Sequence, residues 1–239
     1  MKDQLDLLYD LQQLDTRIDY ASRELRGLDD GSAKRAELAA AEQELSELEE
    51  ALHKRNSEQL DKELQLESTE AERADKWGKA YGGTISDSKE LASLERKIEE
   101  LQRRKSKLED ELLDIYDDIE SRTSEVDTQS AGVATLRAEL DEILATFEHR
   151  STELRGVIAE ARGMREEIVG GLEPNLLADY EAIRERVGGL AVATAQGQLC
   201  SGCRVSMSLM IYESVQAGKQ VVRCEGCRRI LHPGRETGT

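Results

Sequence analysis

The sequence of 239 residues has little of what builds a large globular core. Aromatic residues make up 3% of it and only two prolines are present, whereas charged residues make up 35%. Too few large apolar side chains are therefore available to stabilise one compact core. A composition of this kind is typical either of a disordered chain or of a coiled coil, and periodicity decides between the two.

The sequence also lacks the apolar segments that direct a chain to a membrane. No apolar run approaches the ~18 residues that span a bilayer, and residues 1–6 lack the basic and apolar regions of a signal peptide. We therefore expect a cytoplasmic protein without a membrane partner. Its four cysteines all fall within the last 40 residues, and in that compartment we expect them to be reduced and to serve a metal or catalysis.

A first long segment carries the heptad pattern of a coiled coil. Apolar residues recur in steps of three and four over residues 7–28 and again over residues 38–64, where Leu60 and Leu64 are the last members. A Gly-Leu-Asp-Asp-Gly stretch at residues 27–31 separates the two parts, and we expect it to break or kink the helix.

A second segment is more regular, because one heptad frame extends over residues 91–119 and 133–168 with Lys105 and Arg150 as polar exceptions, although the stretch at 121–132 is polar and weakly patterned. A frame of this length indicates a coiled coil rather than disorder. Residues 78–88 between the segments hold three glycines, so we expect a loop there and an antiparallel pair of helices.

A loop centred near Gly82 fixes which residues face each other. The break at 27–31 then lies opposite residues 133–137, beside Gly132, so both arms are expected to bend at one level. The basic cluster at 103–107 is expected to form interhelical ion pairs rather than nucleic-acid contacts. Its predicted partners are the carboxylates of Glu58, Asp61 and Glu63. A polar layer in the seam is expected from Arg55, Gln59 and Lys105.

All four cysteines belong to one motif near the C-terminus. Cys200-Ser201-Gly202-Cys203 is followed, after twenty residues, by Cys224-Glu225-Gly226-Cys227, and two such pairs at this separation are typical of zinc sites. Thiolates suit tetrahedral Zn²⁺, and four of them leave no open position, so we predict one structural zinc ion on Cys200, Cys203, Cys224 and Cys227. The alternatives are two disulfides or a redox dithiol, which the cytosolic context and the absence of a βαβ pattern disfavour.

The residues around this motif predict a small separate module. Pro174 suits the first turn of a short helix that Gly188 and Gly189 close. Short strands are expected at 190–195, 221–223 and 229–232. The predicted fold is mainly α, with a long kinked antiparallel two-helix coiled-coil hairpin over 1–172 and a short helix plus a C4 β zinc ribbon over 173–239. Metal binding should supply most of the folding free energy of so small a ribbon.

Together these features resemble a bacterial family of C4-type zinc-ribbon, coiled-coil proteins. The resemblance rests on the hairpin, on Ser-Lys-Glu-Leu-Ala-Ser-Leu-Glu at 88–95, and on the cysteine motif with Arg-Arg-Ile-Leu-His at 228–232. It implies a kinked coiled coil followed by a zinc ribbon, and nucleic-acid binding or regulatory interactions with transcription or secretion components. The arginine-rich composition looks like that of an actinobacterial member. His232 stands where an aromatic residue often ends the run, which weakens a stacking role there.

The distribution of charge singles out the ribbon as the candidate nucleic-acid surface. The formal net charge of the chain is −17, so its average surface repels phosphates and any contact must be local. From residue 200 onward, six residues are basic and three are acidic. The candidate contacts to RNA or DNA phosphates are Arg204, Lys219, Arg223, Arg228 and Arg229. The alternative is that these cations only offset the anionic thiolates and keep the module soluble.

The loop end of the hairpin is a second candidate surface, for protein partners. The only tryptophan, Trp77, and Tyr81 stand close to Gly82 and Gly83. Exposed aromatic rings at such a tip can anchor a partner, or they can cap the apolar end of the coil.

Nothing in the sequence predicts catalysis or a small-molecule substrate. His53 and His149 are expected on exposed helix faces, and no serine, histidine and carboxylate set is indicated. We expect a non-enzymatic regulator that binds nucleic acid through the ribbon. The alternative is a protein adaptor whose partners dock on the helical arm or its tip.

Overall fold

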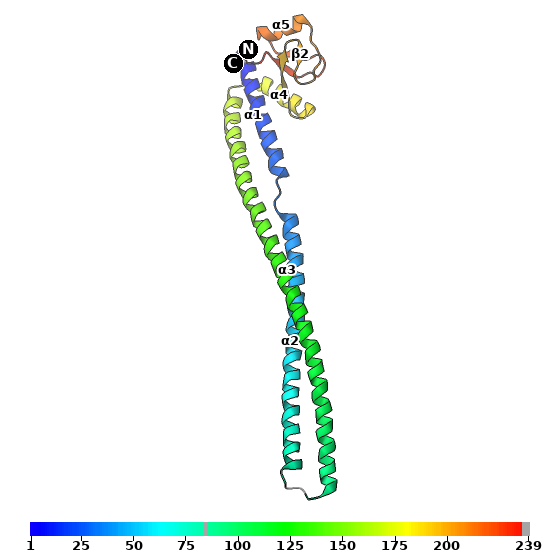
Figure 1. Ribbon diagram of the computed structural model, residues 1–239. Helices are drawn as coiled ribbons and strands as arrows, with labels where there is room; N and C mark the ends of the chain where they lie inside the picture. Colours follow the sequence, from blue (N-terminus) through cyan, green and yellow to red (C-terminus); the bar gives the residue numbers. More distant parts are fainter. Residues whose placement is uncertain (84–85, 236–239) are drawn as a thin grey trace. The chain divides into compact units, whose positions relative to one another are not determined.

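The computed structural model describes residues 1–83 and 86–235 (Figure 1). Over these residues the elements are α1 (Lys2–Gly27), α2 (Ser32–Tyr81), α3 (Ser88–Gly170), α4 (Pro174–Val187), β1 (Val192–Gln196), β2 (Leu199–Cys200), α5 (Leu209–Ala217), β3 (Val222–Arg223) and β4 (Ile230–His232). The chain forms two compact units, one of Gly31–Ile143 and one of Met1–Asp30 with Leu144–Thr239. In the described part of the chain, no helix has the length and apolar character needed to cross a bilayer.

The Gly31–Ile143 unit is an antiparallel pair of α2 and the first part of α3. The seam of α3 follows the predicted heptad frame and buries Ile98, Leu101, Leu108, Leu112 and Ile115. The seam of α2 is weaker, because half-buried Gln59 and Lys62 occupy it. Leu60 and Leu64, predicted as seam residues, are 60% and 64% exposed. That prediction is wrong because steps of three and four from Gln59 lead to Lys62 and Leu66, which places both leucines outside the seam.

The register of this pair differs from the one predicted. Lys62 forms an ion pair with Glu111, whereas the predicted loop centre would have placed Gln102 opposite Lys62. The difference arises because α2 continues as helix through Gly78 and ends only at Tyr81. One glycine inside a helix lowers the stability of the helix by only about 1 kcal/mol, so a long helix can continue through it. Of the predicted loop, residues 78–81 are therefore helical, and residues 84 and 85 lie outside the described residues.

The observed register also changes the partners of the basic cluster at residues 103–107. Lys105 Nζ lies 2.5 Å from a carboxylate oxygen of Glu70, and Arg103 pairs with Glu99 of its own helix at 3.3 Å. Among the described residues, the predicted ion pairing between the helices is confirmed for Lys105 alone, since Arg103 and Lys107 pair within α3. The predicted partners Glu58, Asp61 and Glu63 were wrong. Arg55 meets Asp118 at 2.8 Å, so it does not share a polar layer with Lys105.

The predicted break in the first arm is confirmed. Helix α1 ends at Gly27, Leu28 is extended, and Gly31 adopts a φ of 74° before α2 begins. Helix α3 is continuous through Gly132, so the helix is interrupted in one arm only.

Within the other unit, the last part of α3 shifts its heptad frame once. After Phe147 the buried position is Ser151, which is 3% exposed, and not Arg150. Met164, predicted in the seam, is 43% exposed, and half-buried Arg165 takes its place. Two successive steps of four constitute a stutter, so the prediction of a single frame up to residue 168 is wrong beyond Phe147.

The same unit packs α1 and α4 against the ribbon sheet. Its largest apolar cluster joins Leu5, Leu8, Leu11, Leu172, Leu176, Tyr180, Ile183, Ala191, Val192 and Ile230. Each fully buried leucine contributes about 1.5–3 kcal/mol, so Leu8 and Leu11, both 0% exposed, anchor α1 firmly. Buried Gln12 adds a polar link, because its Oε1 accepts hydrogen bonds from the N–H groups of Ala191 at 2.6 Å and Val192 at 3.1 Å.

The ribbon itself is a small sheet with the strand order β2-β1-β4-β3, in which β1 and β4 are parallel and the other pairs antiparallel. Three of these strands correspond to the predicted ones. Pro174 opens α4 and Gly188, at a φ of 72°, closes it as predicted. Helix α5 between the cysteine pairs was not predicted, although Ser208 caps it by accepting from the Ile211 N–H at 3.4 Å.

Candidate metal centre

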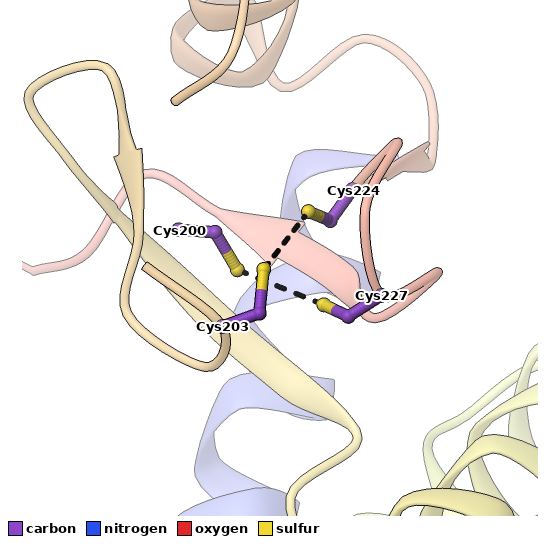
Figure 2. Close-up of side chains that lie close together, drawn as sticks. All are labelled: Cys200, Cys203, Cys224 and Cys227. Carbon is purple, nitrogen blue, oxygen red and sulfur yellow. Dashed lines mark hydrogen bonds between the residues drawn. The ribbon is translucent and has the colours of Figure 1, made fainter. Parts of the chain in front are cut away.

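Two tight turns of the same shape bring the four cysteines together (Figure 2). The first turn follows β2, and the N–H of Arg204 donates to the carbonyl of Cys200 at 2.8 Å. The second follows β3, and the N–H of Arg228 donates to the carbonyl of Cys224, also at 2.8 Å. Each turn therefore closes one C-x2-C pair, and each presents two sulfur atoms on the same side.

The sulfur atoms have the spacing of a tetrahedral metal site. The Sγ atoms of Cys200 and Cys227 lie 3.9 Å apart, those of Cys203 and Cys224 lie 3.6 Å apart, and all four lie within 4.8 Å of one another. Zn–S bonds of about 2.3 Å in a tetrahedron place the sulfurs about 3.8 Å apart. All four cysteines are free thiols, so the disulfide alternative does not describe this structure. The set fits one Zn²⁺ ion, which would crosslink the two turns.

Buried Cys200 and half-buried Cys227 differ in their electrostatic surroundings. Burial raises the pKa of the Cys200 thiol to about 12. At Cys227 burial acts in the same direction, but the N–H and the guanidinium of Arg229, together with neighbouring thiols, lower the pKa to about 6. Metal binding requires the thiolate form of each ligand, and Arg229 favours that form at Cys227.

A glycine precedes the second cysteine of each pair because side chains from elsewhere in the ribbon occupy the space. A Cβ on Gly202 would lie 2.7 Å from Cδ of Arg229, and one on Gly226 would lie 3.2 Å from a methyl group of Val205. The absence of a Cβ at Gly202 thus allows the Arg229 side chain to lie along the first turn.

Two of the five candidate phosphate contacts are engaged within the protein. Arg223 forms an ion pair with Asp179 of α4 at 2.6 Å. Arg229 donates from Nε to the carbonyl of Leu190 at 2.7 Å and is half-buried. Their positive charges are therefore partly satisfied, and the sequence could not indicate this because the partners lie about 40 residues away in the chain.

The other three candidates have free side chains. Arg204, Lys219 and Arg228 are exposed, and among residues 1–83 and 86–235 their side chains form no ion pair or hydrogen bond. Arg204 and Arg228 directly follow Cys203 and Cys227, and they adopt φ angles of 61° and 62°. They are the non-glycine residues with positive φ in the described part of the chain.

Two of the three histidines are exposed and the third is buried. His53 and His149 are exposed, as predicted. His232 is 1% exposed, stacks on the ring of Tyr9 with centroids 4.5 Å apart, and lies 3.0 Å from Asp6 through Nε2. It therefore joins β4 to α1 and is not available to stack on a base.

At the tip of the Gly31–Ile143 unit, the two candidate aromatic residues are exposed and in contact. Trp77 and Tyr81 are 56% and 53% exposed, and their ring centroids lie 4.6 Å apart. Gly82 is required because a Cβ there would lie 2.5 Å from the carbonyl oxygen of Gly78, and Gly83 has a φ of 80°. Among the described residues at this end Ala80 is buried whereas both rings are more than half exposed, which favours a free aromatic surface over a cap of the coil.

Comparisons with known proteins agree with this architecture. Residues 11–188 match the family model of the CT398-like coiled coil hairpin domain, and residues 199–231 match that of the C4-type zinc ribbon domain. An uncharacterized protein of Mycobacterium tuberculosis, an actinobacterium, is 30% identical over 149 residues, which cover 61% of this chain and 60% of the relative. The match therefore spans less than two thirds of that relative.

Two solved structures share the fold. A protein of Mycobacterium smegmatis gives a TM-score of 0.77 at 22% identity, covering 98% of this chain and 99% of its own. CT398 of Chlamydia trachomatis gives 0.65 at 16% identity, covering 96% and 97%. At these identities the likeness concerns the fold alone.

Proposed function

We propose, for a chain that belongs to the CT398-like coiled coil hairpin family and ends in a C4 zinc ribbon, a non-enzymatic role in which the ribbon binds nucleic acid. In this proposal Arg204 and Arg228 contact phosphates, and Lys219 adds a third positive charge. The four thiolates complete the coordination of zinc, so the metal stabilises the ribbon and has no open position for a substrate. The four free thiols also support a cytoplasmic location.

The observation that carries the proposal is the conformation of the two arginines. A residue other than glycine, asparagine or aspartate is uncommon at positive φ. Each such residue destabilises the folded state by about 1–2 kcal/mol. The ribbon has an arginine in this conformation after the second cysteine of both turns, where glycine would be free of strain. A positive charge at these two positions therefore has a use that compensates for the strain.

The alternative reading, that the arginines only offset the thiolate charge, is less well supported. Arg229 already performs that task, because its guanidinium lowers the pKa of Cys227. Neither Arg204 nor Arg228 forms a side-chain hydrogen bond or ion pair in the described part of the chain. Exposed guanidinium groups with all five donors available are suited to phosphate oxygens.

The expected binding is independent of base sequence. Tyr212 is half-buried and His232 is buried, so neither offers a free ring for base stacking. Contacts limited to phosphates position a protein on nucleic acid without reading the bases.

The test is a fluorescence anisotropy titration with labelled 20-nucleotide single-stranded RNA and a 20-base-pair DNA duplex. The variant is Arg204→Asn with Arg228→Asn, because asparagine tolerates the left-handed conformation while removing the charge. The matched control is Arg103→Gln with Lys107→Gln, which removes two charges from exposed positions of α3 that are 81% and 78% exposed. We expect the ribbon variant to lose most of the affinity and the control to retain it. Equal affinities of all three proteins would contradict the proposal.

A further inference from the structure

The Gly31–Ile143 unit exposes several large apolar side chains on its outer surface. Among the described residues of Gly31–Ile143, six such side chains are between 43% and 64% exposed. They are Leu60, Leu64, Trp77, Tyr81, Leu113 and Tyr116. None of them belongs to the seam between α2 and α3.

Their heptad positions place five of the six on one side of the pair and the sixth, Leu64, on the adjoining outer surface of α2. If the seam residues are a and d, Gln59 and Lys62 take these positions in α2, and Leu112 and Ile115 take them in α3. Leu60, Tyr81 and Leu113 then occupy b positions. Trp77 and Tyr116 occupy e positions, and Leu64 an f position. The c and g positions on the other side of the seam hold no large apolar side chain over residues 56–81 and 95–120.

Two hydrogen bonds between the helices show that these positions form a continuous face. The Tyr116 hydroxyl of α3 donates to Glu63 of α2 at 2.8 Å. At the tip, the Tyr81 hydroxyl of α2 donates to Glu95 of α3 at 3.2 Å. The e and b positions of α2 therefore adjoin the e positions of α3, as expected for an antiparallel pair. We call the e, b and f positions of residues 56–81 and 95–120 the apolar face.

The charges on the apolar face are mostly negative. Its basic residues are Arg96 and Arg103. Its acidic residues are Glu63, Glu67, Glu70, Glu95, Glu99, Glu109, Asp110, Asp117 and Glu120. Among them Glu67, Asp110, Asp117 and Glu120 are exposed and form no ion pair within the described part of the chain. The face thus combines apolar anchors with unpaired negative charge.

We propose that the apolar face is a docking site for an amphipathic helix with basic flanks, supplied by a partner protein. The apolar side of such a helix would lie between α2 and α3 and cover Leu60, Leu113 and Tyr116, completing a three-helix bundle over this stretch. Lysine or arginine residues beside its apolar side would meet the unpaired carboxylates. Helices recognised in this way use anchors spaced by three and four residues, and tryptophan and tyrosine are common among the side chains that dominate binding energy.

A second copy of this chain is a poorer occupant. Pairing two copies through this face would bring nine acidic and two basic residues of one copy against the same set of the other. Like charges placed opposite each other oppose association. The charge of the face therefore selects a basic partner.

Trp77 makes the site directly measurable, because it is the only tryptophan of the chain and lies on the apolar face. The probe is a tryptophan-free 21-residue helical peptide with leucine at the a and d positions and lysine at the flanking positions. A second peptide, with glutamate in place of lysine, tests the charge requirement. Tryptophan fluorescence and calorimetry of the full chain at 150 mM salt give the affinities.

Variants on the two faces separate specific docking from general attraction to an acidic protein. Leu60→Gln with Leu113→Gln removes two exposed anchors, and Glu67→Gln with Asp110→Asn removes two unpaired charges. The matched control, Glu72→Gln with Asp114→Asn, removes two charges at g and c positions on the other side of the seam. All these positions are exposed, and circular dichroism of each variant is to check that it keeps the helical content of the wild type.

We expect saturable binding of the lysine peptide, weakened about tenfold or more by the leucine variant, as loss of central anchors does in other interfaces. The charge variant should bind more weakly, the control should bind like the wild type, and the glutamate peptide should not bind. The proposal is overturned if the lysine peptide does not bind, or if the leucine variant and the control bind it equally. It is also overturned if sedimentation shows a dimer of the chain that the leucine variant abolishes, since the occupant would then be a second copy.

Discussion

The hydroxyl of Tyr180 donates a hydrogen bond of 2.7 Å to the carboxylate of Asp15. Both side chains are buried, at 0% and 2% exposure, and the contact joins α1 to α4. Arg165 of α3 donates to the same carboxylate at 2.8 Å. Three helices of this unit thus share one buried charge, whose partners compensate for the loss of its hydration.

Replacing Tyr180 by phenylalanine should destabilise this unit by about 1–3 kcal/mol, because the buried carboxylate loses a donor while the apolar packing is retained. Urea unfolding followed by circular dichroism measures the change. The matched control is Tyr116→Phe, which removes an exposed tyrosine bonded to Glu63 and should leave the transition unchanged. Equal effects of the two substitutions would contradict the claim that the hydrogen bond to Asp15 stabilises this unit.

Alkaline pH should weaken the same contact. Burial, followed by the hydrogen bond to Asp15 and its negative charge, raises the pKa of Tyr180. A raised pKa in the folded state gives stability that is present below the unfolded value of about 10 and is lost as pH rises beyond it. The stability difference between the wild type and Tyr180→Phe should therefore be constant up to about pH 9 and shrink above pH 10. A difference that does not change between pH 8 and 11 would contradict this assignment.

Removal of the metal should unfold the ribbon and leave the Gly31–Ile143 unit helical. Cys224→Ser deletes one of four ligands, and a structural zinc ion supplies most of the folding free energy of so small a module. Elemental analysis should give one zinc per chain for the wild type and for Ser206→Ala, an exposed neighbour in the same ribbon, and much less for Cys224→Ser. A folded ribbon without bound metal would contradict the claim that the four cysteines stabilise the ribbon by binding zinc.

Glycine at either left-handed arginine should stabilise the zinc-bound ribbon. Arg204→Gly and Arg228→Gly each relieve a strain of about 1 kcal/mol or more, less the entropy that glycine loses on folding. The net gain should be a few tenths of a kcal/mol to 1 kcal/mol, measured from the thermal transition. Lys219→Gly, at ordinary φ, should give no gain, and a loss of stability in both arginine variants would mean that their side chains serve the fold.

The cysteine spacing and the heptads predicted much of this molecule. Two C-x2-C pairs define a zinc ribbon locally, because each pair closes its own turn and needs only one metal to join them. The heptad steps predicted α1, α2 and α3, and the pair of glycines and aspartates at residues 27–31 predicted the break between α1 and α2. These features depend on neighbours in the sequence, which is why they can be read from it.

Other features depend on contacts between distant residues and were missed. The predicted register was wrong because Gly78 lies in helix α2, although the glycine-rich composition of residues 78–88 indicated a loop. The side chains of His232 and Gln12 form hydrogen bonds with residues more than 170 positions away in the chain. The side chains of Arg223 and Arg229 also bind partners within the protein. The exposure of Leu60 and Leu64 likewise follows from polar residues in the seam of α2, which a search for apolar periodicity passes over.

The salt dependence of nucleic-acid binding tests the central claim most directly. Each phosphate contact adds about 0.7 for single strands, or 0.9 for duplex DNA, to the slope of log affinity against log salt concentration. If Arg204 and Arg228 each hold one phosphate, Arg204→Asn with Arg228→Asn should lower the slope by about 1.4 to 1.8 with the zinc still bound. The wild type and the Arg103→Gln, Lys107→Gln control should share one steeper slope. A zinc-loaded ribbon variant with the slope and affinity of the wild type would contradict the claim that the ribbon binds phosphates.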